Sequence, residues 1–312
     1  MYYGLISKKS FSLILLALAI LLALPQFLPR FYVYLLGVIF VAGLLATSLN
    51  MVLGFGGMYQ FHHGVFYGFG AYTAALVVAK AGLSYWIGLL AAPVTAALLG
   101  LVMGIICIRL SKLYFGMLQI SLGSLVWVIV FRWYDLTGGD DGIHGIAIPD
   151  AIYGTQSNYY FILAVTVACL ILMYVITNSP FGQAFQAIRD NPDRCEALGV
   201  NVRTHQLIGL VMAAFFAGVA GALFVAVEGS VFPDLLFWSL SLEVFIMCLL
   251  GGWFIFLGPL FGAAAIIILR TFVSTYTDYW SAVLGVIMML TILFLPDGIL
   301  GFFQKKIHKT QS

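Results

Sequence analysis

The chain has 312 residues, of which 63% are hydrophobic and only 8% are charged, and its formal net charge is +2 at pH 7. With a mean hydropathy of +1.08, this composition excludes a soluble globular domain and predicts a polytopic membrane protein. The small net charge and the dispersed basic residues give no support to a nucleic-acid partner. The four cysteines are far apart and have no histidine at ligand spacing, which indicates neither a disulfide framework nor a metal site.

Apolar segments that approach the length of a membrane span, about 20 residues, recur along the whole chain. They lie at 11–28, 33–53, 64–80, 85–108, 114–133, 159–177, 204–227, 240–254, 256–273 and 279–295. The first segment follows Lys8 and Lys9, but Pro25 is not followed by a small-residue cleavage pattern, so we interpret it as a retained span. The sequence thus predicts an all-α membrane protein of about ten helices, forming a single transmembrane domain over residues 1–312.

The apolar pattern is interrupted between the second and third predicted helices, near 54–63. Glycines at this density predict a broken helix or a re-entrant turn, which a membrane tolerates only where protein or a water-filled path covers the backbone. Adjacent histidines point in different directions on a helix, so a shared metal is not expected. We expect this segment either to line a polar translocation path or to pack the broken helix, and its candidate residues are Gly56, Gly57, Gln60, His62 and His63.

One acidic residue, Glu243, lies near the start of the eighth predicted helix, after Ser239 and Ser241. An ionisable group in hydrocarbon normally marks a transport path or a charge pair. Alternatively, a carboxylate in the first turn is favoured by the helix dipole and still reaches the outer interface. Both interpretations of Glu243 stay open at this point.

The fourteen lysines and arginines are divided unequally between the two sides of the predicted membrane. With the N-terminus inside, the outer segments contain only Arg30, Lys80, Arg132 and Arg270. The inner segments contain the other ten: Lys8, Lys9, Arg109, Lys112, Arg189, Arg194, Arg203, Lys305, Lys306 and Lys309. This bias predicts that both termini and the loop 179–203 are cytoplasmic, and that 134–158 and 228–239 are loops on the periplasmic side.

The most polar stretch of the chain is 179–199. It begins with an apolar stripe at helical spacing, formed by Phe181, Phe185 and Ile188. Asn191 and Pro192 then predict the N-cap and first residue of a second short helix, which Gly199 would end. The stretch is predicted as two short amphipathic helices on an aqueous face, and an ordinary solvated loop is the alternative.

No motif for hydrolysis is found in the chain. It contains no H-E-x-x-H, no G-x-S-x-G and no P-loop, so it has no recognisable means of hydrolysing ATP itself. If transport is energised by ATP, a partner ATPase acting on the cytoplasmic loop must supply the energy. The alternative is a secondary transporter driven by an ion gradient through Glu243 or His63.

Four sequence blocks resemble the inner-membrane permeases of branched-chain amino acid ABC transporters, specifically the longer of the two paired permease types. Their order and spacing along the chain make the resemblance specific. The blocks are Leu49–Gly57 continuing into His63 and Gly68–Ala75; Leu136–Ile143; Phe181–Gly199 with Asn201 and Val202; and Pro233 with Ser241–Glu243, Leu250–Gly252, Gly258–Pro259 and Phe294–Gly301.

The resemblance implies a coupling helix that docks on a cytoplasmic ATPase. Its residues would be Ala187, Ile188, Arg189, Asp190 and Asn191, with Glu196, Ala197 and Gly199. The resemblance also implies a bacterial inner-membrane location, a second permease in a heterodimer, two ATPase subunits carrying ATP and Mg, and a periplasmic substrate-binding protein. No cofactor is expected in this chain, and the implied mechanism is alternating access driven by the ATPases.

Two departures from the family pattern leave the substrate open. Gln60 stands where the family usually has a small serine, and His62 where it has a glycine. Trp253-Phe254 replaces a pattern with a further glycine. Bulkier groups near the proposed path would reshape it, so branched-chain amino acids are one option beside aromatic or other organic acids, amides and urea.

Overall fold

The computed structural model describes residues 8–110 and 112–276, together with 279, 282, 283, 285–287, 289, 298 and 301. The helices, in chain order, are α1 (Lys8–Phe27), α2 (Arg30–Asn50), η1 (Met51–Phe55), α3 (Gly64–Ala79), α4 (Tyr85–Cys107), α5 (Lys112–Arg132), α6 (Tyr134–Thr137), η2 (Asp150–Ile152), α7 (Thr155–Asn178), α8 (Pro180–Asp190), α9 (Pro192–Ala197), α10 (Val202–Glu228), η3 (Pro233–Leu236), α11 (Trp238–Gly251) and α12 (Gly258–Val273). Across these residues the only β pairing is an isolated bridge between Ile143 and Val231. The all-α prediction is therefore confirmed for the described chain, and most of the predicted tenth span and the C-terminus lie outside it.

Five of the described helical stretches are long and apolar enough to cross a membrane. They are Arg30–Phe55, Tyr85–Cys107, Leu113–Arg132, Thr155–Asn178 and Val202–Glu228. Four further predicted spans are shorter apolar helices, and α11, with 14 residues, extends only about 21 Å, against about 30 Å of hydrocarbon. The predicted total of about ten spans therefore stays a prediction.

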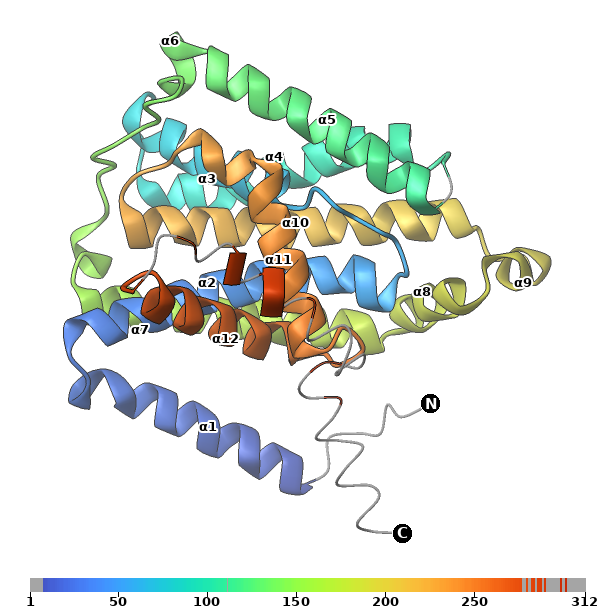
Figure 1. The fold of residues 1–312 in the computed structure, drawn as a ribbon, viewed down its shortest axis with the longest axis horizontal. Helices are drawn as coiled ribbons and strands as arrows, with labels where there is room; N and C mark the ends of the chain where they lie inside the picture. Colours follow the sequence, from blue (N-terminus) through green and yellow to red (C-terminus); the bar gives the residue numbers. More distant parts are fainter. Residues whose placement is uncertain are drawn as a thin grey trace.

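The long helices run in a common direction, and α11 runs across it in Figure 1. One end of the bundle carries α8 and α9, and we call it the α9 end. The opposite end, which we call the α6 end, carries α6, η2 and the C-terminus of α10. This arrangement places the segments predicted as cytoplasmic and periplasmic at opposite ends, while which end faces the cytoplasm stays a prediction.

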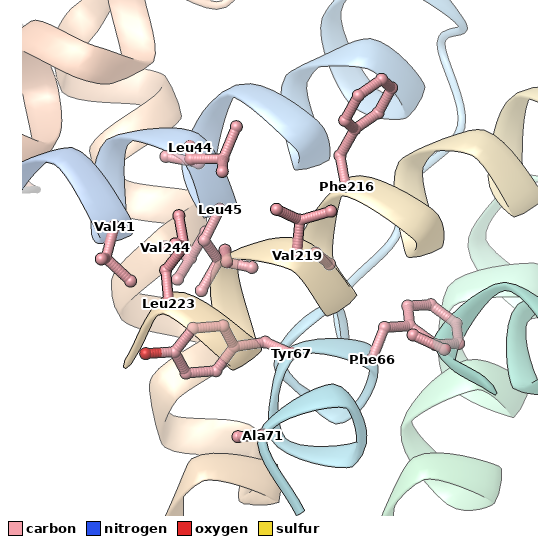
Figure 2. Close-up of a cluster of buried hydrophobic side chains, with 14 of the residues drawn as sticks. Val41, Leu44, Leu45, Phe66, Tyr67, Ala71, Phe216, Val219, Leu223 and Val244 are labelled. Carbon is pink, nitrogen blue, oxygen red and sulfur yellow. The ribbon is translucent and has the colours of Figure 1, made fainter. Parts of the chain in front are cut away.

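The core is built around α10, which packs against α2, α3 and α4. Figure 2 shows side chains of α2, α3, α10 and α11 meeting there, among them Leu45, Tyr67 and Leu223. Small residues bring the backbones close together, since a Cβ atom added to Gly70 would lie 2.6 Å from Cα of Gly218. Close contact strengthens the van der Waals packing that holds the helices together, because the hydrophobic effect provides little force between helices in lipid.

The predicted break after the second span is present in the structure. α2 widens into the π-helical turn η1 and ends, Gly57 adopts a φ of 65°, and the chain stays non-helical until α3 begins at Gly64. A left-handed φ favours glycine because a Cβ atom clashes there.

The predicted outer loop 228–239 differs from a simple exposed loop. Val231 and Leu236 are fully buried, and η3 packs against α3 and α5. The loop folds back into the bundle because its apolar side chains find a buried site between these two helices.

Candidate functional site

The polar stretch 179–199 forms two short helices, and its caps follow from the local sequence. The Ser179 hydroxyl oxygen accepts a hydrogen bond from the Gly182 N–H (3.3 Å) at the start of α8. The Asn191 side-chain oxygen accepts one from the Arg194 N–H (2.9 Å) at the start of α9. Each helix has proline in its first turn, where the missing N–H costs nothing. The predicted N-cap and helix start at Asn191 and Pro192 are confirmed.

Phe185 anchors α8 to the membrane helices. Its ring occupies a slot between two glycines, because a Cβ atom would lie 2.3 Å from the ring if added to Gly56 and 2.5 Å if added to Gly209 of α10. Phe185 is 4% exposed and belongs to the main core. Gly56 at the break and Gly209 on α10 thus make room for the helix that carries the predicted coupling residues.

Arg189 ties α8 to the helix break by a polar contact. Its Nη1 donates a hydrogen bond to the Gly54 carbonyl oxygen (2.9 Å), and its guanidinium lies over the Phe254 ring, 5.4 Å from the centroid. A second guanidinium nitrogen pairs with Asp190 at 2.8 Å. The α8 backbone is equally close, since a Cβ atom on Gly57 would lie 3.3 Å from Cα of Arg189.

The loop between α11 and α12 completes this contact. A Cβ atom on Gly54 would lie 2.0 Å from the Trp253 carbonyl oxygen, so the loop packs directly on the break. We call the meeting point of the break, α8 and this loop the junction; it consists of Gly54, Gly56, Gly57, Phe185, Arg189, Trp253 and Phe254. Trp253-Phe254, noted as a departure from the family pattern, is therefore part of it.

The predicted coupling residues fall into an exposed and an inward-facing set. Ile188 is buried in a small separate core with Cys195 and Val202, and Arg189 is 26% exposed and points toward the break. The exposed residues are Ala187, Asp190, Asn191, Glu196, Ala197 and Gly199. Leu198, which the sequence analysis did not select, is 78% exposed among them. The exposed set forms a surface of mixed charged and apolar character at the α9 end.

His62 lies fully buried between α5 and η3. Its Nε2 is 2.9 Å from the Leu236 carbonyl oxygen and its Nδ1 is 3.2 Å from that of Ile120. A neutral imidazole has one N–H, and the shorter contact assigns it to Nε2. Gly123 of α5 provides the space, because a Cβ atom there would lie 2.1 Å from Nδ1 of His62.

His63 faces a different partner. Its Nε2 is 2.8 Å from the Ser48 hydroxyl oxygen, and the Ser48 hydroxyl itself donates to the Leu45 carbonyl oxygen (2.7 Å). Since that hydroxyl has only one proton, His63 Nε2–H is the donor of their shared hydrogen bond. His62 and His63 thus point apart, and within the described residues no three potential metal ligands come together.

Unpaired polar atoms gather beside the break. Both polar atoms of the buried Asn50, Gln60 and Gln119 side chains, and Nδ1 of His63, have no hydrogen-bond partner in the described chain. Asn50 comes directly before η1, Gln60 precedes the histidines, and Gln119 lies on α5 between the two glycines that accommodate 59–62. An unpaired buried polar group costs about 1–3 kcal/mol, so this concentration is typical of a functional segment.

Glu243 is paired rather than isolated. One carboxylate oxygen lies 3.6 Å from Nη1 of Arg270 on α12, and the Glu243 side chain is 11% exposed. The elements before Glu243 contact the histidine segment. Leu236 of η3 contacts His62 through its carbonyl oxygen, and the Ser241 hydroxyl oxygen on α11 accepts a hydrogen bond from the Gly64 N–H (2.9 Å). The structure shows this charge pair, while a transport-path role for Glu243 stays a prediction.

Sequence reasoning missed Ser48 and Gly123 in this region, and it named Ser241 and Phe254 without predicting their contacts. Phe185 had been assigned only to an apolar stripe. A usable signal existed for α5, where Gly116 and Gly123 are seven residues apart and share a helix face. Phe61 packs at the first and His62 at the second.

The comparisons with known proteins agree with the resemblance. Residues 31–292 match the family described as "Branched-chain amino acid transport system / permease component". The high-affinity branched-chain amino acid transport system permease protein LivM of Escherichia coli (strain K12) is 28% identical over 95% of this chain and 75% of its own length. The corresponding LivH protein of Salmonella typhimurium is 26% identical over 83% of this chain and 90% of its own length.

Among solved structures, PsaBC from Streptococcus pneumoniae in complex with Fab has a similar fold. Its TM-score is 0.50 at 17% identity, and the match covers 90% of this chain and 97% of that chain. The five spanning helices and the permease relatives together indicate a multi-pass membrane protein. The match over residues 31–292 shows that this chain belongs to the branched-chain amino acid transport permease family.

Proposed function

We propose that this chain is the transmembrane permease subunit of an ATP-driven importer, energised by partner ATPases and without an ATPase site of its own. The observation that carries the proposal is the contact of α8 with the helix break, made by Arg189 with the Gly54 carbonyl oxygen and by Phe185 in its glycine slot. A helix docked on an ATPase could move the break only if the two were joined, and these contacts join them.

In the proposed mechanism the exposed residues of α8 and α9 contact the ATPase. These are the predicted coupling residues Ala187, Asp190, Asn191, Glu196, Ala197 and Gly199, to which we add Leu198. Ile188 holds the two short helices together as a rigid unit. Movement of this unit then reaches the break through Arg189, so the coupling function is divided between an outer contact surface and an inner connection.

From the junction, the movement would continue along 58–63 to the buried polar atoms. Gln60, His62 and His63 lie on this segment, and η3 and α11 meet it through Leu236 and Ser241. We propose that the unpaired atoms of Gln60, Gln119 and Asn50 provide hydrogen bonds to a hydrophilic solute when the segment moves. In this mechanism the Glu243–Arg270 pair holds α11 against α12.

The relatives LivM and LivH are named as permeases of one transport system, which supports a second permease as the partner in a heterodimer. Two cytoplasmic ATPases, a periplasmic binding protein at the α6 end and a bacterial inner-membrane location complete the proposal. The solute is proposed to be a branched-chain amino acid or a related small organic molecule.

The test is to purify the tagged chain gently from its native membrane and identify its companions by mass spectrometry. We expect an ATPase and a second permease, and we expect Glu196→Lys to lose the ATPase while keeping the second permease. Asp141→Lys, which reverses an exposed charge at the α6 end, is the matched control and should keep both.

A second measurement separates this proposal from a gradient-driven transporter using Glu243 or His63. Uptake into cells should stop when ATP is depleted and persist when an uncoupler collapses the proton gradient while ATP is maintained. The opposite pattern, with a chain that purifies alone in detergents known to preserve such complexes, would overturn the proposal.

A further inference from the structure

A cavity of about 540 Å³ opens at the α6 end, far along the bundle from the junction. It lies among the first turns of α2 and α7 and the last turn of α10, whose ends meet there (Figure 1). Its volume is within the range of small-molecule sites, about 300–1,000 Å³. Its polar lining includes Arg30, Tyr34, Thr155, Asn158 and Glu228, none of which belongs to the junction or the histidine segment.

One side of the cavity is suited to an anion. α2 and α7 both begin there, and neither has a side-chain N-cap. The Tyr32 N–H donates to the Pro29 carbonyl oxygen, while the N–H groups of the first two residues of each helix remain available as donors. Arg30, the first residue of α2, adds a full positive charge. Within the described chain no carboxylate lies at ion-pair distance from its guanidinium.

The other side is suited to an ammonium group. α10 ends there with Glu228, where the helix dipole adds partial negative charge. The Tyr34 hydroxyl donates a hydrogen bond to Oε1 of Glu228, while Oε2 has no partner in the described chain. The Asn158 amide nitrogen donates to the Ala226 carbonyl oxygen, which leaves the buried Oδ1 of Asn158 unpaired as a second acceptor.

We propose that this cavity binds a small zwitterion that carries a primary ammonium and an anionic carboxylate or phosphate. The anionic group lies at Arg30 and the starts of α2 and α7, and the ammonium donates hydrogen bonds to Glu228 and Asn158. This chemistry has two sources in a cell, the phosphoethanolamine headgroup of a membrane lipid and a free amino acid. A choline headgroup has no N–H and cannot donate to either acceptor, so we expect it to bind this cavity more weakly than a primary ammonium.

The experiment has one arm for each source and uses the purified full chain. In the lipid arm, native mass spectrometry in detergent compares retention of phosphatidylethanolamine and phosphatidylcholine. In the amino-acid arm, saturable binding of radiolabelled leucine is measured in nanodiscs that contain only phosphatidylcholine. We expect at least one arm to give binding. In the lipid arm, phosphatidylethanolamine should be retained about tenfold more strongly than phosphatidylcholine; in the amino-acid arm, leucine should bind about tenfold more tightly to the unaltered chain than to Glu228→Gln. A tenfold difference is the loss typical of a charged hydrogen bond.

Two variants test the assignment of the two sides. Glu228→Gln and Arg30→Gln should each weaken binding about tenfold, whereas Asp141→Asn, an exposed carboxylate at the same end outside the cavity, should leave it unchanged. Unchanged binding in Glu228→Gln would overturn the proposal. Equal retention of the two lipids together with no leucine binding would also overturn it. That result is obtained with the unaltered chain, so it does not require any variant to fold.

Discussion

Replacing Arg189 with alanine should weaken the attachment of the helix break to α8 without unfolding the protein. The variant loses a charged hydrogen bond to the Gly54 carbonyl oxygen (2.9 Å), worth about 1.5–3 kcal/mol. It also loses a cation–π contact with Phe254, worth about 0.5–1 kcal/mol. The pair with the exposed Asp190 adds little, because water screens it.

The sum, about 2–4 kcal/mol, corresponds to a roughly 30- to 700-fold increase in local opening of the break. Hydrogen–deuterium exchange of the purified chain measures this directly as faster exchange of the amides of 51–58, which reports local opening. The amides of Gly57 and Met58, which bond to the Leu53 and Val52 carbonyl oxygens, are the most informative. In the reconstituted transporter the same variant should keep ATP hydrolysis and lose uptake.

Two matched variants sharpen this prediction. Arg189→Lys keeps the charge, but a single ammonium cannot reproduce the planar guanidinium's stacking and directed hydrogen bond, so an intermediate effect is expected. Arg203→Ala removes an exposed cation in the first turn of α10, at the same end, and should change nothing. If Arg189→Ala exchanges at the unaltered rate and transports normally, the connection between α8 and the break is not the coupling element.

Three other predictions follow from single contacts. Gly123→Ala should destabilise the chain by about 1–3 kcal/mol because its methyl group meets His62. When it is combined with His62→Gly, the total loss of stability should be smaller than the sum of the two single losses, and additive losses in thermal unfolding would contradict this steric account. Phe185→Ala should lower stability by about 3–5 kcal/mol, measured in the same assay, and a loss below about 1 kcal/mol would mean that the slot is not packed. Glu243→Gln should impair uptake through loss of its pair with Arg270; normal uptake would show that the pair is dispensable.

The composition and the local patterns of the sequence were sufficient to predict several elements. Apolar runs predicted the long helices because hydrocarbon excludes charge over a fixed length. Asn191 and Pro192 predicted the start of α9 because capping depends only on the next three residues. The density of glycines in 54–57 predicted the break, and one of them, Gly57, adopts a left-handed φ that favours glycine.

The contacts that define the candidate site were decided only by the tertiary structure. Arg189 bonds to a carbonyl oxygen 135 residues away and His62 to one 174 residues away. Backbone carbonyls are the same in every residue, so the sequence contains no mark of which one a side chain will meet. The return of 228–239 into the bundle has a similar origin, since a short apolar loop is buried only if neighbouring helices leave it a site. The sequence therefore determined that this is a broken-helix membrane protein with an amphipathic polar loop, and packing determined that the loop and the break are one connected unit.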